Sequence, residues 1–404
     1  MNGTEERGVD TSRGAAARIA SKLTPAMQQY LEFKSEHEDA LLFFRMGDFY
    51  ELFFEDAEIA ASLLDLTLTS RNRNDEHPIP MCGLPWHAMR PYVARLLEAG
   101  RKVAICEQLE LPEKGIARRK VTRVISPGTN LDEETLAPER SALLAAILER
   151  GGAWGVAVTD YSTGEVRATE VASATGLEEE LRTLSPAEVV LEAGAGGSLA
   201  ARVRAVLPRC LVGEARSGAD GERSRAGRAA STVATSGGSL AKAAANLLAA
   251  HAAATQGGAV AHLREPVLYD ADAFLRLDAS TRRNLELLEA YDGTSRGALA
   301  PVLDRCATGM GRRLLRSWLV RPLADTAAIG ERLDAVEALV EDFSRRADVR
   351  DLLRRIGDFE RLLGRIGGAS AGPSARPSTL FPPWSRASAR PSPTSPRWPR
   401  ARAR

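Results

Sequence analysis

Phe49 and Glu51, within FRMGDFYELFFEDA at residues 44–57, combine residue types and a spacing that suit recognition chemistry. They follow a Gly-Asp turn, and side chains two residues apart on a strand point to the same face. Tyr50 and Leu52 would then point to the other face. An aromatic side chain can insert at a base step and kink a duplex, whereas a carboxylate near phosphates is repelled and its pKa rises. Such a pair penalises intact paired DNA and can hydrogen-bond a displaced base.

The same two residues also have ordinary interpretations that the sequence leaves open. Phe49 fits a core position, because most phenylalanines in proteins are buried. Glu51 fits a solvated charge on a strand or helix. On the pattern alone, this combination of core and surface residues is the more common arrangement.

The composition limits the class of protein. The chain has 404 residues, more than one hydrophobic core usually accommodates, so two or three domains are expected. Its 54 basic and 53 acidic residues nearly cancel, so the net charge of +1 neither indicates nor excludes a polyanionic partner. No stretch approaches the roughly 20 apolar residues of a membrane span, which predicts a soluble, cytoplasmic protein. The four cysteines form no C-x-x-C pair: Cys82, Cys106, Cys210 and Cys306. The sequence therefore predicts neither a zinc site nor a disulfide framework.

Alternating helical and extended patterns predict an α/β domain over residues 24–130. ALLFFRM is typical of a buried strand that ends at the Gly-Asp turn, and FYELFF of a second strand. Helices are expected in the segments EDAEIAASLLD and WHAMRPYVARLLEAG. The intervening RNRNDEHPIPMCGLP, residues 71–85, has turn chemistry and is predicted to be a loop. Residues 1–23 show no periodic pattern and are expected to form a flexible leader.

Residues 131–262 predict a second, mixed α/β domain. Two β runs in AWGVAVTDYSTGEVRATEV are joined by residues 162–165, a hairpin signature. Long helical patterns with paired charges predict a helical third domain over residues 263–366. The segment 367–404 contains no Asp or Glu and is rich in Pro, Ser, Ala and Arg, a composition that predicts a disordered tail. A natural basic tail and a reading-frame shift near Arg365 both explain this change.

Several stretches resemble, in order, the MutS family of DNA mismatch-repair proteins. They are LLFFRMGDFYELFFEDA, PIPMCGLPWHA, VAICEQ, TRVISPGT and LDASTRRNLEL, followed by ATGMGRRLLRSWLVRPLAD. The resemblance covers about residues 24–366 and implies a multidomain α/β plus α fold. Its parts would be a mixed-sheet mismatch-recognition domain, an RNase H-like connector domain and the start of an α-helical lever domain.

The resemblance also implies a function and a site. In the MutS family, the Phe of a Phe-x-Glu motif stacks on the mispaired base from the minor groove, and the Glu hydrogen-bonds to it. The motif falls on Phe49 and Glu51, with mismatched double-stranded DNA as the partner. The same matching implies backbone or groove contacts for Met46 and Arg71. Met46 also fits a core filler, and Arg71 a solvated strand end.

The nucleotide chemistry of the family has no counterpart in this sequence. A Walker A loop requires G-x-x-x-x-G-K-[ST], and the chain contains no Gly-Lys dipeptide. We therefore expect no catalytic residues, cofactor or metal here, with ATP and magnesium belonging to a C-terminal domain beyond this truncated sequence. The resemblance further implies a nucleoid-associated protein, a repair-protein partner bound through the connector, and a homodimer in full-length members that depends on the ATPase domain.

Two other functions remain open. Asp160 ends the first β run of the hairpin, where an RNase H-like nuclease would hold a metal-binding acid. Two-metal catalysis needs several convergent carboxylates, and Glu165 is the only acid close behind, so a structural role for Asp160 is preferred. A protein-interaction fragment without competent DNA binding is the second alternative.

Three arginines lie close together in the sequence of the third region: Arg312, Arg313 and Arg316. They suggest a DNA-binding stripe, although alternating charge on a packed helix is the preferred explanation.

Overall fold

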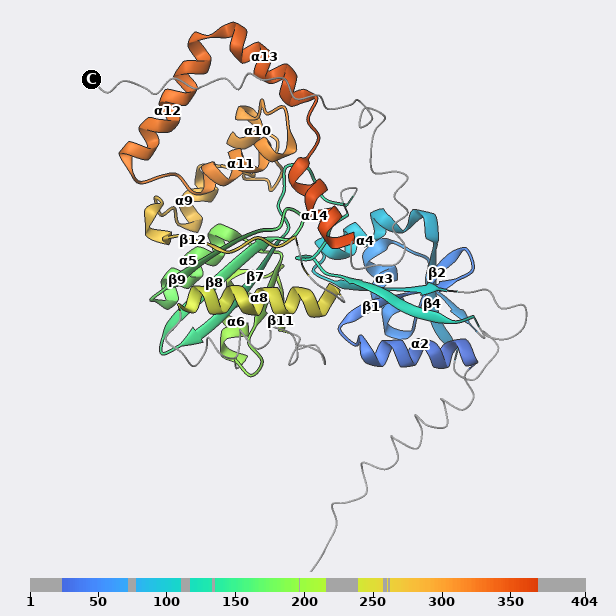
Figure 1. The fold of residues 1–404 in the computed structure, drawn as a ribbon. Helices are drawn as coiled ribbons and strands as arrows, with labels where there is room; N and C mark the ends of the chain where they lie inside the picture. The colour runs from blue at the N-terminus through green and yellow to red at the C-terminus, as the bar shows by residue number, and fades with distance from the viewer. Residues whose placement is uncertain are drawn as a thin grey trace, which may run out of the picture.

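The structure is a computed structural model that shows two sheets, each with its own helices, and a further group of helices (Figure 1). It describes residues 24–71, 78–109, 117–132, 135–195, 197–215, 239–256, 260 and 262–369. The predicted leader and all but the first three residues of the predicted tail lie outside these ranges.

The first sheet lies within the predicted N-terminal α/β region. It is formed by six strands: β1 (Ala40–Met46), β2 (Phe49–Phe53), β3 (Thr69–Arg71), β4 (Ile79–Pro85), β5 (Lys102–Gln108) and β6 (Arg119–Ile125). Their order is β3-β4-β2-β1-β5-β6. β1 pairs antiparallel with β2 and parallel with β5, so the predicted strands ALLFFRM and FYELFF are neighbours near the centre of the sheet.

Helices cover both faces of this sheet, which explains why β1 is a continuous apolar run. They are α2 (Pro25–Glu36), α3 (Phe54–Leu64) and α4 (Met89–Glu98), the last preceded by the short 3-10 helix η1 (Trp86–Ala88). α2 lies on one face, where Tyr30 packs edge-on against Phe44 and Phe53. α3 and α4 lie on the other, over Tyr50 and Leu52 (Figure 1). Alternate residues of β2 therefore face different helical layers.

The prediction of a loop over residues 71–85 is wrong for its second half. β4 occupies residues 79–85 and pairs with both β2 and β3. Ile79, Cys82 and Leu84 are buried. Burial of these three side chains outweighs the turn preference of Pro80 and Gly83, which suggested a loop.

The second sheet also has six strands: β7 (Leu143–Arg150), β8 (Ala153–Asp160), β9 (Glu165–Val171), β10 (Glu188–Leu191), β11 (Leu211–Glu214) and β12 (Val267–Leu268). Their order is β11-β10-β7-β8-β9-β12. β7, β8 and β9 form an antiparallel meander, while β10 is parallel to β7 and β11 is parallel to β10. The predicted hairpin is confirmed, because Asp160 pairs with Glu165 across its turn.

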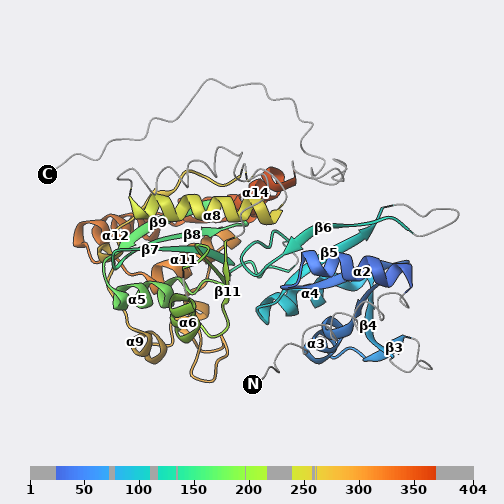
Figure 2. The same ribbon diagram turned by 90° about the horizontal axis from the view of Figure 1, so that it is seen from below.

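Helices lie on both faces of the second sheet as well (Figure 2). They are α5 (Ala174–Leu184) and α6 (Gly197–Val206) on one face and α8 (Leu240–Gln256) on the other. The alanine-rich α8 approaches the strands closely at Gly155, where an added Cβ would lie 2.2 Å from the Leu240 carbonyl oxygen. Glycine is therefore required at this position, since any side chain would force the helix away.

Helices dominate the third region, as predicted. They are η2 (Ala271–Ala273), α9 (Ala279–Asn284), α10 (Leu299–Leu303), α11 (Gly309–Val320), α12 (Thr326–Glu341), α13 (Phe343–Arg354) and α14 (Phe359–Ala369). The helical prediction is wrong for Val267 and Leu268, which form the short strand β12. β12 pairs parallel with β9, because an edge strand offers unpaired backbone groups to a neighbouring segment.

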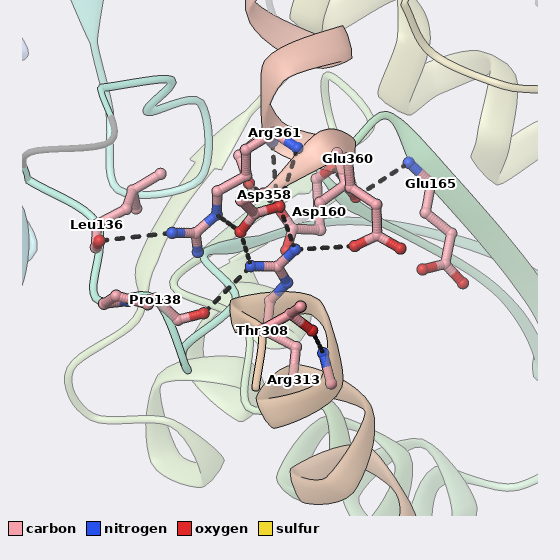
Figure 3. Close-up of polar contacts among 12 residues, drawn as sticks. Leu136, Pro138, Asp160, Glu165, Thr308, Arg313, Asp358, Glu360 and Arg361 are labelled. Carbon is pink, nitrogen blue, oxygen red and sulfur yellow. Dashed lines mark hydrogen bonds and ion pairs between the residues drawn. The ribbon is translucent and has the colours of Figure 1, made fainter. Parts of the chain in front are cut away.

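A buried ion-pair network joins the helical region to the segment between the two sheets (Figure 3). Arg313 of α11 bonds both carboxylate oxygens of Asp358, at 2.6 and 2.9 Å, and also pairs with Glu360 at 2.8 Å. Arg361 of α14 lies 3.9 Å from the Asp358 carboxylate. Both arginines also donate to backbone carbonyls of the linking segment: Leu136, Ala137 and Arg140 for Arg361, and Pro138 for Arg313. We call this group the junction network.

Candidate nucleic-acid interface

The β1–β2 hairpin places the first pair of candidate residues at one end of the first sheet. Its turn consists of Gly47 and Asp48, and Met46 pairs directly with Phe49 across it. Gly47 has a φ of +60°, a conformation that glycine adopts without the penalty of a Cβ. The predicted Gly-Asp turn is confirmed, and it makes Phe49 the first residue of β2.

Phe49 is exposed, whereas its neighbours on β2 are buried. Its side chain is 48% exposed, and Tyr50 and Leu52 are 2% and 0% exposed. The predicted alternation of the strand is therefore confirmed, and the interpretation of Phe49 as a core residue is wrong. Tyr50 and Leu52 belong to the core beneath α3 and α4. The ring of Phe49 is left available to a partner at the end of the sheet.

Glu51 lies on the same face of β2 as Phe49, partly buried beside two arginines. Its Oε2 is buried without a hydrogen bond, and the nearest cation is the Arg71 guanidinium at 3.5 Å. Burial raises the pKa of this carboxyl above its ordinary value, although Arg71 and Arg119 act in the opposite direction. Its partner on β4 is Gly83, which adds no side chain next to it. Among the described residues, this oxygen therefore has an ion pair with Arg71 but accepts no hydrogen bond.

The two lower-ranked candidates lie beside this carboxylate. Arg71 ends β3, and its Nη1 donates to the Met46 sulfur at 3.6 Å. The Arg71 guanidinium also lies 5.8 Å from the centre of the Phe53 ring. The Arg71 side chain thus reaches both Glu51 and Met46, although its backbone pairs with Ile79, at the end of β4 away from Phe49. Met46 is partly buried and packs against the core beside α2, as the core-filler interpretation expects, and Arg71 is partly buried and so is not a fully solvated strand end.

Two residues of this region were not predicted as site residues. Arg119 of β6 lies over the Phe44 ring at 4.7 Å, and its Nε donates to the Arg45 carbonyl at 2.8 Å. Burial lowers the pKa of Arg119. Trp86 is 47% exposed and follows the strand that pairs with Phe49. Only the strand order brings these residues to the hairpin, although Trp86 lies within the recognised PIPMCGLPWHA stretch.

The nuclease alternative depends on Asp160, whose side chain stabilises the turn between β8 and β9. Its Oδ1 accepts hydrogen bonds from the Ser162 amide at 3.1 Å and the Ser162 hydroxyl at 2.6 Å, and so closes the β8–β9 turn. Figure 3 shows Asp160 and Glu165 beside the junction network. An added Cβ on Gly364 of α14 would lie 2.1 Å from the Ser162 carbonyl, so the helix backbone packs directly against this turn. In the described part of the chain, no group of three or more His, Cys, Asp or Glu residues is arranged to hold a metal.

The arginines of α11 have different environments. Arg313 is buried within the junction network and is therefore not part of a DNA-binding stripe. Arg312 is 3.4 Å from Asp304, and Arg316 lines a cavity against α5. The preferred interpretation of packed-helix charges is correct for Arg313. Within the described ranges, no helix is long and apolar enough to cross a membrane.

Comparison with known proteins identifies three domains. The family descriptions are MutS domain I at residues 24–134, MutS domain II at residues 142–264 and MutS domain III at residues 280–382. Domain I contains all four candidate residues. The first sheet falls in domain I, and the first five strands of the second sheet fall in domain II.

Curated relatives give the same result. The DNA mismatch repair protein MutS of Brevibacillus brevis is 42% identical over 355 residues, which is 87% of this chain and 40% of the relative. MutS of Anaeromyxobacter dehalogenans is 43% identical over 86% of this chain and 40% of the relative. MutS of Myxococcus xanthus is 42% identical over 88% of this chain and 41% of the relative. The chain thus spans about two fifths of the length of these proteins.

Proposed function

The chain belongs to the MutS family through its domains I, II and III, and from this premise we propose that it recognises mismatched double-stranded DNA in mismatch repair. Phe49 is the wedge that stacks on the mispaired base from the minor groove. Glu51 is the hydrogen-bonding partner of that base. The observation that carries the proposal is the exposed ring of Phe49 beside a carboxylate oxygen with no hydrogen bond.

The chemistry of the pair follows from its exposure and charge. Inserting a ring between base pairs costs stacking energy, and this cost is least where the bases are already mispaired. The Glu51 carboxylate, whose pKa is already raised by burial, gains a hydrogen-bond donor only from a displaced base edge. In a sound duplex it meets only the repulsion of the phosphates. Phe49 thus favours weak stacks, and Glu51 penalises intact ones.

Met46 and Arg71 support this pair in the proposal. Arg71 holds Glu51 in place from 3.5 Å and offers its remaining N–H groups to the sugar-phosphate backbone. Met46 lies opposite Phe49 and packs beside the groove. A flexible thioether suits this position because it adapts to an irregular surface.

The remaining parts of the chain have supporting roles. We propose that residues 24–130 form the recognition domain, 131–262 an RNase H-like connector and 263–366 the start of a helical lever. The mixed second sheet, with a meander followed by two parallel strands and helices on both faces, supports the connector assignment. The connector would bind a repair protein, and the site of action would be the nucleoid. The proposal assigns DNA binding to domains I to III and makes no assignment of ATP hydrolysis, magnesium or a dimer to them.

A binding experiment at two salt concentrations tests the function. The chain is titrated with a mismatched duplex and with the matched paired duplex of the same length. Affinity for both should fall at higher salt, because phosphate contacts release counterions, while the preference for the mismatch should persist because ring stacking is not ionic. Equal affinity for the two duplexes at both salt concentrations would contradict mismatch recognition. No binding to either duplex would favour the protein-interaction alternative.

A further inference from the structure

Trp86 is a second exposed aromatic residue at the end of the sheet that presents Phe49. Its indole is 47% exposed, and it directly follows Pro85, the pairing partner of Phe49. Its backbone N–H donates to the Asp48 carbonyl at 2.9 Å, which ties it to the turn of the hairpin. Its position beside the recognition turn suits a contact surface, because an indole combines an apolar ring with a polar N–H and is enriched at interfaces.

Arg45 holds the indole in place. Its guanidinium carbon lies 4.6 Å from the centre of the Trp86 ring and 5.5 Å from that of Tyr50. Arg45 also donates to the Gly47 carbonyl and lies 3.9 Å from the Glu107 carboxylate. The cation therefore covers one face of the ring.

The polar end of the indole is its Nε1–H. Within the described residues, the Trp86 Nε1–H has no hydrogen-bond acceptor. Indole N–H is a donor only, so it suits an acceptor such as a phosphate oxygen. If Phe49 enters the minor groove, the Gly47–Asp48 turn, to which Trp86 is hydrogen-bonded, lies at the edge of a groove only about 6 Å wide. Trp86 then faces the sugar-phosphate backbone that borders the groove.

We propose that Trp86 is a DNA-backbone contact that does not depend on the mismatch. Its N–H donates to a phosphate, and its exposed edge packs on the adjacent deoxyribose. This inference rests on the proposed function and adds a second role to the same end of the sheet. Phe49 supplies discrimination, while Trp86 supplies affinity for any duplex.

Affinity measurements with the full 404-residue chain test this division. Trp86→Ala should weaken binding to mismatched and paired duplexes by the same factor, about threefold to tenfold for one hydrogen bond and its packing. Trp86→Phe, which keeps a ring and loses the N–H, should give a smaller loss. A matched control is Trp318→Phe, because Trp318 of α11 is also exposed and covered by a cation, Arg332 at 4.0 Å. This control should leave both affinities unchanged.

Tryptophan emission provides a readout that does not depend on the stability of the alanine variant. Adding paired duplex should quench the wild-type chain and Trp318→Phe more than Trp86→Phe. Equal quenching in all three proteins, with paired-duplex affinity unchanged in Trp86→Phe, would overturn the proposal and leave Trp86 to a protein partner. A loss confined to the mismatched duplex would overturn the mismatch-independent role. Failure of the proposed function appears differently, as equal wild-type affinity for the two duplexes.

Discussion

The junction network and the hairpin end use charged and aromatic side chains in opposite ways. At the junction, Arg361 is 2% exposed and donates to three backbone carbonyls, and Arg313 is held by two carboxylates. At the hairpin, Phe49 is half exposed and Glu51 keeps a buried oxygen without a hydrogen bond.

The exposure of a charged or aromatic side chain distinguishes a recognition residue from a structural one better than its residue type does. Buried charges in a fold are normally paired and hydrogen-bonded. A side chain that is fully satisfied inside the protein has nothing left to offer a ligand. A site that binds DNA must keep some of its interactions unmade until the DNA arrives. The hairpin shows that property in the exposed ring of Phe49, whereas Arg313 and Arg361 of the junction network are buried.

The largest expected effect is on stability at the junction. Arg361→Met should lower the free energy of unfolding of the helical region by about 3 to 5 kcal/mol, because it removes one member of a buried ion-pair network. Arg354→Met is the control, since the Arg354–Asp351 pair is largely exposed and should change stability by less than about 0.5 kcal/mol.

Denaturation combined with hydrogen exchange measures this effect. Backbone amides of residues 135–142 should exchange faster in Arg361→Met than in the wild-type chain, because Arg361 holds the carbonyls of this segment. Identical exchange in Arg361→Met and Arg354→Met would show that the network does not fix the linking segment.

Substitution of Glu51 is expected to have a smaller effect, on the affinity for DNA. Glu51→Gln should raise affinity for paired duplex by about 1 kcal/mol, roughly fivefold, which is the scale of the repulsion between two charges about 4 Å apart in water. Affinity for the mismatched duplex should rise less, because a hydrogen bond from the base is weakened at the same time. Unchanged paired-duplex affinity, measured by fluorescence anisotropy, would contradict the repulsive role of the carboxylate.

The same variant should change the pH dependence of stability. Because burial raises the pKa of Glu51, its ionised form costs folding free energy. Glu51→Gln should therefore be more stable than the wild-type chain at pH values above the raised pKa. The difference should shrink as the pH falls through that pKa toward the ordinary carboxyl value. A difference that grows on acidification, in denaturant titrations across this range, would show that the carboxylate is stabilised instead.

The smallest effect is expected at Asp160. Asp160→Asn keeps an oxygen that can accept from the Ser162 amide, so stability should fall by no more than about 1 kcal/mol. Neither the wild-type chain nor the variant should cleave duplex DNA with magnesium present. Magnesium-dependent cleavage that disappears in Asp160→Asn would restore the nuclease alternative.

Local patterns predicted much of the hairpin and its surroundings. Alternation in FYELFF placed Phe49 and Glu51 on one face, and the Gly-Asp pair predicted the turn. Both depend on interactions between near neighbours in sequence. The resemblance to the MutS family added Met46 and Arg71 to the same site, where the Arg71 side chain contacts both Met46 and Glu51.

Features that depend on distant pairing were not predictable in this way. The turn residues of β4 predict a loop from local sequence, and the segment is a strand because it pairs with β2 and buries Cys82 and Leu84. The roles of Arg361 and Trp86 depend on contacts with segments far along the chain or on strand order. Arg361 bonds carbonyls more than 220 positions earlier in the sequence. No local period or motif carries that information.

The most direct test of the account compares Phe49→Ala with Phe343→Ala. Phe343 of α13 is 72% exposed and lies outside domain I, so it controls for the loss of an exposed ring. The ratio of affinities for mismatched and paired duplexes should fall in Phe49→Ala by a factor that corresponds to about 1 to 3 kcal/mol, the usual value of stacking between a base and an aromatic ring. It should stay at the wild-type value in Phe343→Ala. A wild-type ratio in Phe49→Ala would contradict the assignment of this ring as the mismatch reader.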